Sequence, residues 1–453
     1  MRTTFGQGRR SLIVASVLTC SALPVASAQA SAQPLGAALD AYLAPLVASH
    51  EFSGNIVVRR GDRVIAQRSY GMANREFGVA NDSSTRLLVG SISKQFTAAA
   101  IFALAEQGKL STADHLDKYV RDFPRGGEIT IGQMLVHTSG ISRDLANAAD
   151  AVTPHSSAEL VEIIRQQPLA FAPGTSSGYS NNAYKILAYI VEQVSGETYG
   201  AFLERNFFRP LGMLHTGDLA SLTLVPHMAG GYSPGFGAEG FGPSPHLDIS
   251  NSRGAASIYS TANDLATWSA HFLIRGDVRP GVRDSLLVGS GRGTGVALYK
   301  GKRVVSHDGV YQGFTSYIVT VPEDSLTIVY LGNTETAASV APLQEALFQL
   351  VSGKTVAPPR IVARTTTNAP GNRADYVGVF EFFPGLQVRI RPEGNTLVLG
   401  TSDGAYPIEW RTPDRGFYRL KYADIVFGRD TSGKVNAITW TEAGNTYTAH
   451  RIP

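Results

Sequence analysis

Residues 91–107 are the segment that most constrains what this chain can fold into. They read SISKQFTAAAIFALAEQ, in which strong helix formers dominate and apolar residues occur almost all round the predicted helix. A helix on a protein surface would instead carry polar residues along one face. A helix of this composition is normally buried in the middle of a domain, so other elements must cover it.

The neighbouring segments mix strands and helices. Residues 54–70 are typical of a hairpin with its turn at Gly61-Asp62, and helices are predicted for residues 183–194 and 261–274. Three successive strands are predicted at residues 304–306, 314–321 and 325–331. Because strands come early and late while helices fill the middle, we expect an α/β sandwich whose sheet takes strands from both ends of the chain.

Composition divides the chain into a large mixed region, residues 34–353, and a small β region, residues 374–453. Residues 354–373 separate them, and their proline and threonine content without apolar periodicity predicts a linker. In the last region apolar and polar residues alternate between turn signals at Gly394-Asn395, Asp403-Gly404 and Ser432-Gly433. A length of 453 residues suits two domains, and a small closed or nearly closed β-barrel is expected for the second.

Residues 1–30 have the pattern of an export signal. Arginines precede an apolar run at residues 12–23, and the small-residue site Ala26-Ser27-Ala28 follows it. The run is too short to cross a bilayer of about 30 Å as a helix, although a membrane anchor is the alternative interpretation. We therefore expect a secreted or periplasmic protein with no stable membrane insertion after signal removal.

Charge and composition argue against several classes of partner. The formal charge of +3 comes with no block of like charge and no basic stripe, so no nucleic-acid partner is expected. The only cysteine, Cys20, lies in the export signal, and cleavage near Ala28 would leave no thiol for disulfides or catalysis. The ten histidines are scattered, so we expect neither a metal site nor a cofactor. A small molecule or a peptide remains as the expected partner, and the oligomeric state stays open.

Ser91 and Lys94 stand three residues apart at the start of the buried helix and therefore share one helix face. A lysine in an apolar environment loses the solvation of its charge, so its pKa falls and it can activate a serine beside it. The N–H of Ser91, at the helix N-terminus, is a candidate donor to an oxyanion. A surface lysine one turn after a helix cap would have the same spacing. The Ser91 and Lys94 spacing taken by itself leaves that alternative open.

Tyr179-Ser180-Asn181 is predicted to lie on a loop before the helix at residues 183–194. A tyrosine near a cationic lysine would ionise more easily and could act as a base. Asn181 could orient both the lysine and a carbonyl or amide of the substrate. The alternative is a turn in which Asn181 is the N-cap of the helix.

His307-Asp308-Gly309 follows the strand predicted at residues 304–306. Gly309 would let substrate or backbone come close, and the N–H of Val310 could complete an oxyanion hole with that of Ser91. His307 could hold the lysine and tyrosine or contact the substrate. The alternative is a polar turn between strands.

In this order the three segments resemble the three-box layout of β-lactamases and penicillin-binding proteins. The surrounding text is similar to the class C-like branch of that family at residues 90–97 (GSISKQFT), 135–141 (LVHTSGI), 259–265 (YSTANDL) and 307–314 (HDGVYQGF). The segment at 135–141 is interpreted as structural. The resemblance covers residues 35–352, and the tail from about residue 374 resembles the lipocalin-like barrel that some members carry.

The resemblance implies an antiparallel sheet flanked by helices, with a helical subdomain, followed by the small barrel. It also implies a site with Ser91, Lys94 and Tyr179 as catalytic residues and with substrate-binding positions at Asn181, His307, Gly309 and Val310.

The third box departs from the pattern of other β-lactamases. His307 and Asp308 stand where a lysine and a hydroxyl residue help to bind the substrate carboxylate. Asp308 would repel a carboxylate if its side chain faced the cleft, so efficient β-lactam hydrolysis is not expected. Members with the histidine form resemble esterases, D-amino-acid amidases and peptidases.

The sequence thus predicts a serine hydrolase that acts through an acyl-enzyme on an ester or amide, such as a D-amino-acid peptide or amide or a small ester. One alternative is a catalytically silent protein that binds a cell-wall peptide or a small ligand in the same cleft. Another assigns the function to the barrel, as a binder of an apolar ligand. Similarity of fold does not choose among substrates.

Overall fold

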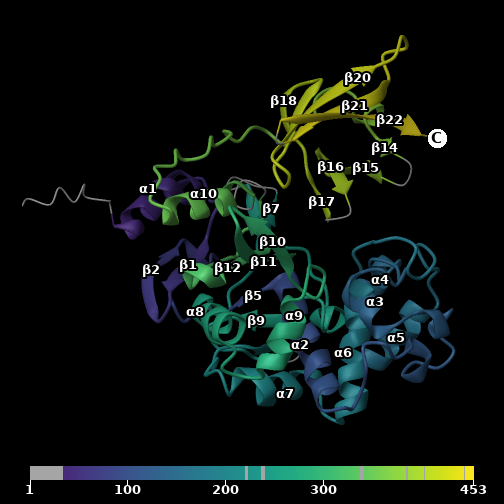
Figure 1. The fold of residues 1–453 in the computed structure, drawn as a ribbon. Coiled ribbons are helices and arrows are strands. Elements are labelled where there is room, and N and C mark those ends of the chain that lie inside the picture. Colours follow the sequence, from purple (N-terminus) through teal and green to yellow (C-terminus); the bar gives the residue numbers. More distant parts are fainter. Residues whose placement is uncertain are drawn as a thin grey trace, which may run out of the picture.

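The computed structural model of the chain (Figure 1) describes residues 34–219, 223–235, 240–336, 341–383, 386–401, 404–442 and 444–452. The predicted export signal, residues 1–30, lies outside these ranges. Within them, no helix has both the length and the apolar content needed to cross a membrane.

A six-stranded antiparallel sheet forms the centre of the first region. Its order is β10 (Gly295–Tyr299), β11 (Lys302–Tyr311), β12 (Phe314–Val321), β13 (Leu326–Gly332), β1 (Gly54–Arg60) and β2 (Arg63–Tyr70). The early strand β1 pairs with the late strand β13, with Ile56 opposite Tyr330. The prediction that strands from both chain ends share one sheet is therefore confirmed.

Each face of this sheet has its own helical layer (Figure 1). Helices α1 (Leu35–Ala48) and α10 (Ala341–Val351) cover one face of the sheet. Helices α2 (Ser93–Glu106) and α8 (Ala262–Thr267) lie on the opposite face. Side chains alternate along β12, so the strand contributes residues to the cores on both faces of the sheet. Phe314 and Ile318 belong to the core on the α2 side, whereas Val319 and Val321 belong to the core under α1 and α10.

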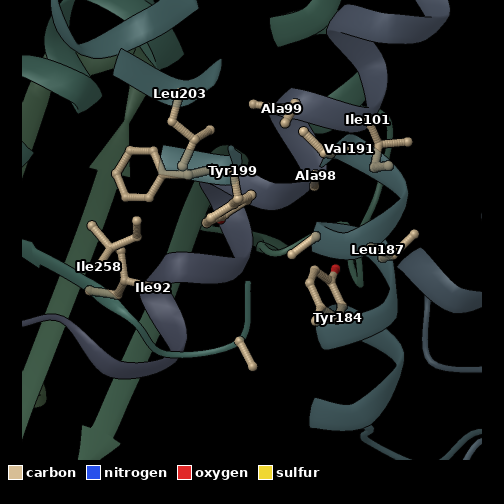
Figure 2. Close-up of a cluster of buried hydrophobic side chains, with 14 of the residues drawn as sticks. Ile92, Ala98, Ala99, Ile101, Tyr184, Leu187, Val191, Tyr199, Leu203 and Ile258 are labelled. Atoms are coloured by element: carbon tan, nitrogen blue, oxygen red, sulfur yellow. The ribbon is translucent and has the colours of Figure 1, made fainter. Parts of the chain in front are cut away.

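Helix α2 is enclosed as its composition predicts, since every residue from Ser93 to Leu104 is buried. Helix α6 (Asn181–Ser195) packs along it, and Figure 2 shows Ala98 and Ile101 of α2 beside Leu187 and Val191 of α6. The other helices and short strands of this region are α3 (Ile131–Leu135), α4 (Ala148–Val152), α5 (Ser157–Arg165), α7 (Tyr199–Leu203), α9 (Pro280–Leu287), β3 (Met72–Asn74), β4 (Val79–Ala80), β5 (Leu87–Leu88), β6 (Gly217–Asp218), β7 (Tyr232–Pro234), β8 (Phe241–Pro243) and β9 (Ile258–Ser260).

The C-terminal region is a nearly closed antiparallel barrel of nine strands, which confirms the predicted β architecture. Their order is β17 (Gly404–Pro407), β16 (Thr396–Thr401), β15 (Leu386–Glu393), β14 (Gly378–Phe383), β22 (Asn445–Ile452), β21 (Val435–Glu442), β20 (Ala423–Arg429), β19 (Arg415–Tyr418) and β18 (Glu409–Thr412). Val388 and Ile390 point into its core as their alternation predicts. The turn signals at residues 394–395 and 432–433 lie between paired strands, while Asp403 lies outside the described residues.

The segment between α10 and the barrel contains no long helix or strand among its described residues, but it lies against the barrel. Thr366 forms a bridge with Trp410, and Asn368 forms another with Thr396. The N–H of Val362 donates to the Tyr422 hydroxyl at 2.7 Å. The predicted linker is thus bound along its length.

Candidate active site

Ser91 lies in a 3-10 turn, η1 (Gly90–Ile92), that leads directly into α2. Gly90 has a φ of +50°, a conformation that favours glycine. A side chain there would also collide with strand β11, because its Cβ would lie 2.9 Å from the N atom of Val310. The glycine before the serine therefore permits backbone-to-backbone contact between η1 and β11.

Lys94 lies one helical turn after Ser91 and is completely buried. Its Nζ is 3.1 Å from Ser91 Oγ and donates to the backbone carbonyl of Ala255 at 2.9 Å. Burial holds the pKa of Lys94 well below its ordinary value, and repulsion from Lys185 and Arg143 acts in the same direction, against attraction from Asp144. The predicted effect of the apolar environment on the lysine is therefore confirmed in direction.

Tyr179 lies on the loop before α6, with its ring 4.9 Å from Lys94 Nζ. Burial raises the pKa of Tyr179 to about 12, and its interaction with the side chain of Ser91 only partly offsets this. The expectation that a cationic lysine would make the tyrosine ionise more easily is therefore wrong. The same burial that favours neutral Lys94 also favours the neutral phenol.

His137, in the segment interpreted as structural, packs against Tyr179 with ring centroids 4.4 Å apart. The N–H of Ser180 donates to its Nδ1 at 3.1 Å, so this nitrogen keeps a lone pair. Burial, with repulsion from Lys94, lowers the pKa of His137 to about 4, which keeps the ring neutral. The backbone carbonyl of His137 also accepts from Gly178, so this segment holds the tyrosine loop in place.

Asn181 is the first residue of α6, and the N-cap is Ser180, whose hydroxyl accepts from the N–H of Ala183 at 2.9 Å. The alternative interpretation of Asn181 as the N-cap is therefore wrong. Its side-chain amide donates to Asp144 Oδ1 at 2.7 Å, a carboxylate that also lies 3.3 Å from Arg143. Asn181 thus orients a surface ion pair beside the tyrosine.

His307 and Gly309 lie within β11, because the strand is longer than predicted. Gln312 and Gly313 have φ values of +48° and +82° and form a two-residue hairpin turn, so pairing with β12 continues to Tyr311. The alternative of a polar turn at this position is wrong. His307 Nδ1 donates to the backbone carbonyl of Asp308, and burial lowers the pKa of His307, so its Nε2 is an acceptor.

The register of β11 separates His307 from Asp308. His307 is opposite Ile318, on the face of the sheet that meets α2, whereas Asp308 is opposite Tyr317, which packs under α1 and α10. Directly opposed residues share a face. The side chain of Asp308 therefore lies on the face of the sheet away from Ser91, although its charge still acts on Lys94 and Tyr179.

Gly309 and Val310 bring β11 against the nucleophile turn. A Cβ on Gly309 would lie 2.3 Å from the carbonyl oxygen of Val89 and 2.9 Å from the N atom of Ser91. Val310 pairs with Thr315, the pair next to the closing pair of Tyr311 and Phe314, and this second pair is a non-hydrogen-bonded one in a two-residue hairpin. Its N–H therefore points to the open edge of the strand, where the turn of Ser91 lies.

The structure thus brings six of the seven predicted positions together. The seventh, Asn181, directs its side-chain amide to Asp144 instead. The acceptor that sequence reasoning missed is the carbonyl of Ala255, a backbone group that carries no signal of its own in the sequence. Among the described residues, no three or more His, Cys, Asp or Glu side chains gather as a metal site.

Comparison with known proteins finds relatives of the first region. The family model described as "Beta-lactamase" matches residues 39–351. The chain is 31% identical over 306 residues to the putative penicillin-binding protein PbpX of Bacillus subtilis, covering 66% of this chain and 75% of that protein.

Two solved structures share the fold. An octameric penicillin-binding protein homologue from Pyrococcus abyssi covers 91% of this chain and 98% of its own, with a TM-score of 0.61 and 21% identity. A D-amino acid amidase from Ochrobactrum anthropi covers 70% of this chain and 98% of its own, with a TM-score of 0.62 and 18% identity. The first of these likenesses extends into the barrel, and the family match rests on the region that holds Ser91. This chain therefore belongs to the β-lactamase family of serine hydrolases.

Proposed function

We propose that this protein hydrolyses an ester or amide through an acyl-enzyme on Ser91. The observation that carries the proposal is the 3.1 Å separation between Ser91 Oγ and the fully buried Nζ of Lys94. A lysine whose pKa is lowered by burial spends more of its time as a neutral amine, and a neutral amine can accept a proton.

In the proposed first step, Lys94 accepts the hydroxyl proton of Ser91 as Oγ attacks the carbonyl carbon of the substrate. The C–O bond forms, the carbonyl π electrons move onto the oxygen, and Lys94 becomes an ammonium. The N–H groups of Ser91 and Val310 bind the oxyanion, each with an effect on the order of a hundredfold or more. Their positions between η1 and β11 support this assignment.

Tyr179 is the proposed acid for the leaving group. With a pKa of about 12 it holds its proton at neutral pH, and it lies against Lys94, which can return a proton to it. The bond to the leaving group breaks as this proton transfers, and the acyl-enzyme remains. Water then attacks the ester of Ser91, with the same pair exchanging protons in reverse.

The proposed substrate class is a small ester or a D-amino-acid amide or peptide rather than a β-lactam. His307 occupies the position at which typical β-lactamases carry a lysine, and its lowered pKa leaves it neutral. A neutral imidazole offers no charge to a substrate carboxylate. The likeness to a D-amino acid amidase shows a shared fold and agrees with this class.

We also propose the domain limits and the location predicted from the sequence. These are an export signal at residues 1–30, a hydrolase domain at 34–353, a linker at 354–373 and a barrel at 374–453 in a secreted or periplasmic protein. The N-terminal sequence of protein recovered from the exported fraction tests the signal, and cleavage elsewhere than near residues 28–30 contradicts it.

Intact-mass spectrometry after treatment with a fluorophosphonate, and separately with a penicillin, tests the proposed chemistry. We expect one fluorophosphonate adduct that is absent from Ser91→Ala. The matched control is Ser93→Ala, which removes a hydroxyl two residues away that accepts from the N–H of Ile258. Folded wild-type protein that reacts with neither reagent would instead support the catalytically silent binding protein.

A cavity in the barrel favours a second candidate function, the binding of an apolar small molecule. It has a volume of about 810 Å³, and its lining is mainly apolar and aromatic, with Phe382, Leu386, Val388, Trp440 and Tyr447 beside the charged Arg389, Lys421 and Glu442. Volumes of this size are typical of ligand pockets. The probe is 8-anilinonaphthalene-1-sulfonate, whose fluorescence should rise with folded protein and fall with Val388→Glu. An unchanged signal in the variant contradicts a site in this cavity.

A further inference from the structure

We infer that Arg364, in the segment before the barrel, is a positioning residue for hydrolysis, because it connects the barrel to the hairpin that braces the oxyanion strand β11. The inference rests on the proposed function and adds to it a role for the barrel. Its evidence is a continuous series of contacts from the barrel core to Val310.

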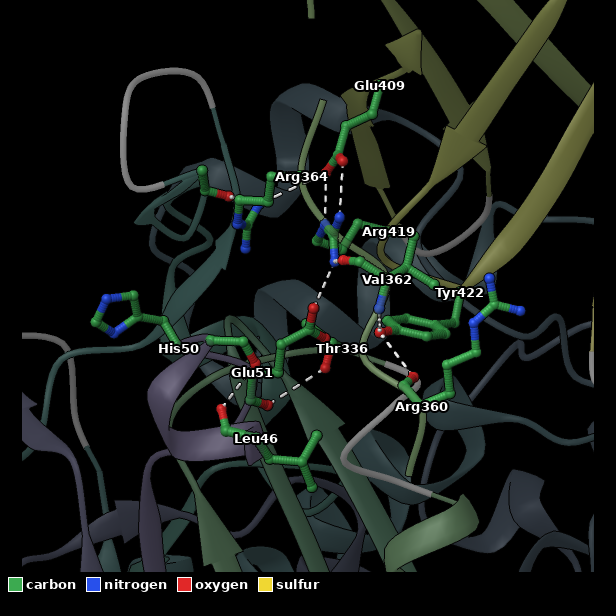
Figure 3. Close-up of polar contacts among 12 residues, drawn as sticks. Leu46, His50, Glu51, Thr336, Arg360, Val362, Arg364, Glu409, Arg419 and Tyr422 are labelled. Carbon is green, nitrogen blue, oxygen red and sulfur yellow. Dashed lines mark hydrogen bonds and ion pairs between the residues drawn. The ribbon is translucent and has the colours of Figure 1, made fainter. Parts of the chain in front are cut away.

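The first contact in the series is a buried charge cluster that joins the barrel to the first region (Figure 3). Arg419 is 1% exposed and forms a two-pronged interaction with Glu409, in which its Nη2 donates to Oε2 at 2.7 Å. Its Nη1 donates to Glu51, the buried carboxylate that follows α1, and to the carbonyl of Val362. A buried arginine needs such partners, so this cluster holds the barrel at a defined position.

Arg364 extends the cluster toward the active-site face. Its Nη1 lies 3.5 Å from Glu409 Oε1 and donates to the carbonyl of Gly240 at 2.9 Å. Its guanidinium also lies 4.3 Å from the ring centroid of Phe241, which is buried. One side chain therefore binds a barrel carboxylate, a backbone carbonyl beside β8 and an aromatic ring of β8.

The hairpin of β7 and β8 connects Arg364 to the turn at the end of β11, because it contacts both. Pro234 pairs with Phe241, which joins the two strands. A Cβ on Gly231, immediately before β7, would lie 2.0 Å from the carbonyl oxygen of Gln312. The N–H of Gly313 donates to the carboxylate of Glu335 at 3.1 Å, and the N–H of Glu335 donates to the β7 backbone.

The turn that the hairpin contacts is Gln312-Gly313, and it follows Tyr311 directly. Val310 is the residue before Tyr311 in β11. Backbone atoms in direct contact leave no side chain to absorb a displacement, so a shift of the hairpin moves the turn and the strand. Displacements of about 1 Å in a catalytic site can cost on the order of 100-fold in rate. The barrel thus acts on the hydrolase site through Arg364 without touching the substrate.

Arg364→Ala tests the inference in the full-length protein, with steady-state hydrolysis of a p-nitrophenyl ester as the readout. We expect kcat to fall by roughly tenfold or more with KM within about threefold of wild type, because the oxyanion contact acts mainly in the transition state. Arg364→Lys, which keeps the charge and a donor but not the planar stack, should recover part of the loss.

The matched control is Arg360→Ala, an exposed arginine four residues earlier whose backbone carbonyl accepts from Tyr422. It should leave kcat unchanged. Thermal unfolding of each variant is monitored by circular dichroism, so that activity is compared at temperatures where every variant is folded. If Arg364→Ala does not fold, Arg364→Lys alone carries the test, with an expected partial loss of kcat.

Two outcomes separate this inference from the proposed function. Wild-type protein that forms the Ser91 adduct while Arg364→Ala and Arg364→Lys keep the wild-type kcat would overturn the inference alone. Wild-type protein that forms no adduct would overturn the proposed function and the inference with it. An equal fall in kcat for Arg360→Ala would also overturn the assignment to Arg364.

Discussion

Replacing Gly309 with alanine tests how closely β11 must approach the nucleophile turn. A Cβ at this position would lie 2.3 Å from the carbonyl oxygen of Val89, 2.5 Å from Ser316 Oγ and 2.9 Å from the N atom of Ser91. Non-bonded heavy atoms pack at about 3.5 Å, so the strand must retreat from the turn by roughly 1 Å. The atoms in the way are mainly backbone, which cannot move aside as a flexible side chain would.

This retreat sets the size of the expected effect. Misplacing a catalytic group by about 1 Å, or losing one oxyanion donor, costs about 100-fold or more. We therefore expect kcat/KM of Gly309→Ala to fall by about 100-fold. Overpacking should lower the free energy of unfolding by about 1–3 kcal/mol, which includes strain on the hydrogen bond from Ser316 Oγ to the carbonyl of Val89.

Ester hydrolysis and urea denaturation of the same preparation measure the two effects. Gly400→Ala is the matched control, since it is also a strand glycine, but its Cβ would meet its nearest neighbours at an ordinary 3.6 Å. The control should keep wild-type activity. The reasoning is refuted if Gly309→Ala keeps more than about a third of the wild-type kcat/KM, because β11 would then not need to lie so close to Ser91.

Three further predictions concern the charges around the site. Lys94→Met should lower kcat by on the order of 1,000-fold, the scale of lost acid–base catalysis, in the same ester assay. Because the folded pKa of Lys94 lies below its unfolded value of about 10.5, the unfolded chain binds the extra proton between the two values, and stability rises with pH across that window. Lys94→Met should therefore be no less stable than wild type in urea at pH 7, and its stability should change less with pH; a clear loss of stability would contradict the neutral lysine. The pH profile of kcat/KM should show an acid limb with its midpoint well below the ordinary lysine pKa, and no alkaline limb from Tyr179 until the pH approaches about 12. Asp308→Asn should change kcat/KM by less than about threefold because its side chain lies on the far face of the sheet, and a tenfold change would argue for the opposite register.

Much of the fold follows from local patterns in the chain. Helix α2 is buried all round from Ser93 to Leu104 because most positions there are apolar or small, and period-two alternation yields the inner face of the barrel. The spacing of Ser91 and Lys94 is equally local, since three residues along a helix return to the same side. Such features depend only on backbone geometry and on neighbours in sequence.

Only the tertiary structure decided how distant segments meet, and it changed the interpretation of several residues. The face to which Asp308 points depends on the register of β11 against β12, in which a shift of one residue would reverse it. The direction of the Tyr179 pKa shift depends on burial by segments far away in the chain, which outweighs the opposing effects of the Ser91 side chain and of Arg143. The pairing of Arg419 with Glu51 joins residues 368 positions apart, and a contact of that separation leaves no periodic trace in the sequence. Burial and partner identity are properties of the assembled chain, so the sequence by itself determines the elements and the catalytic spacing, while packing determines the charges, faces and contacts of the site.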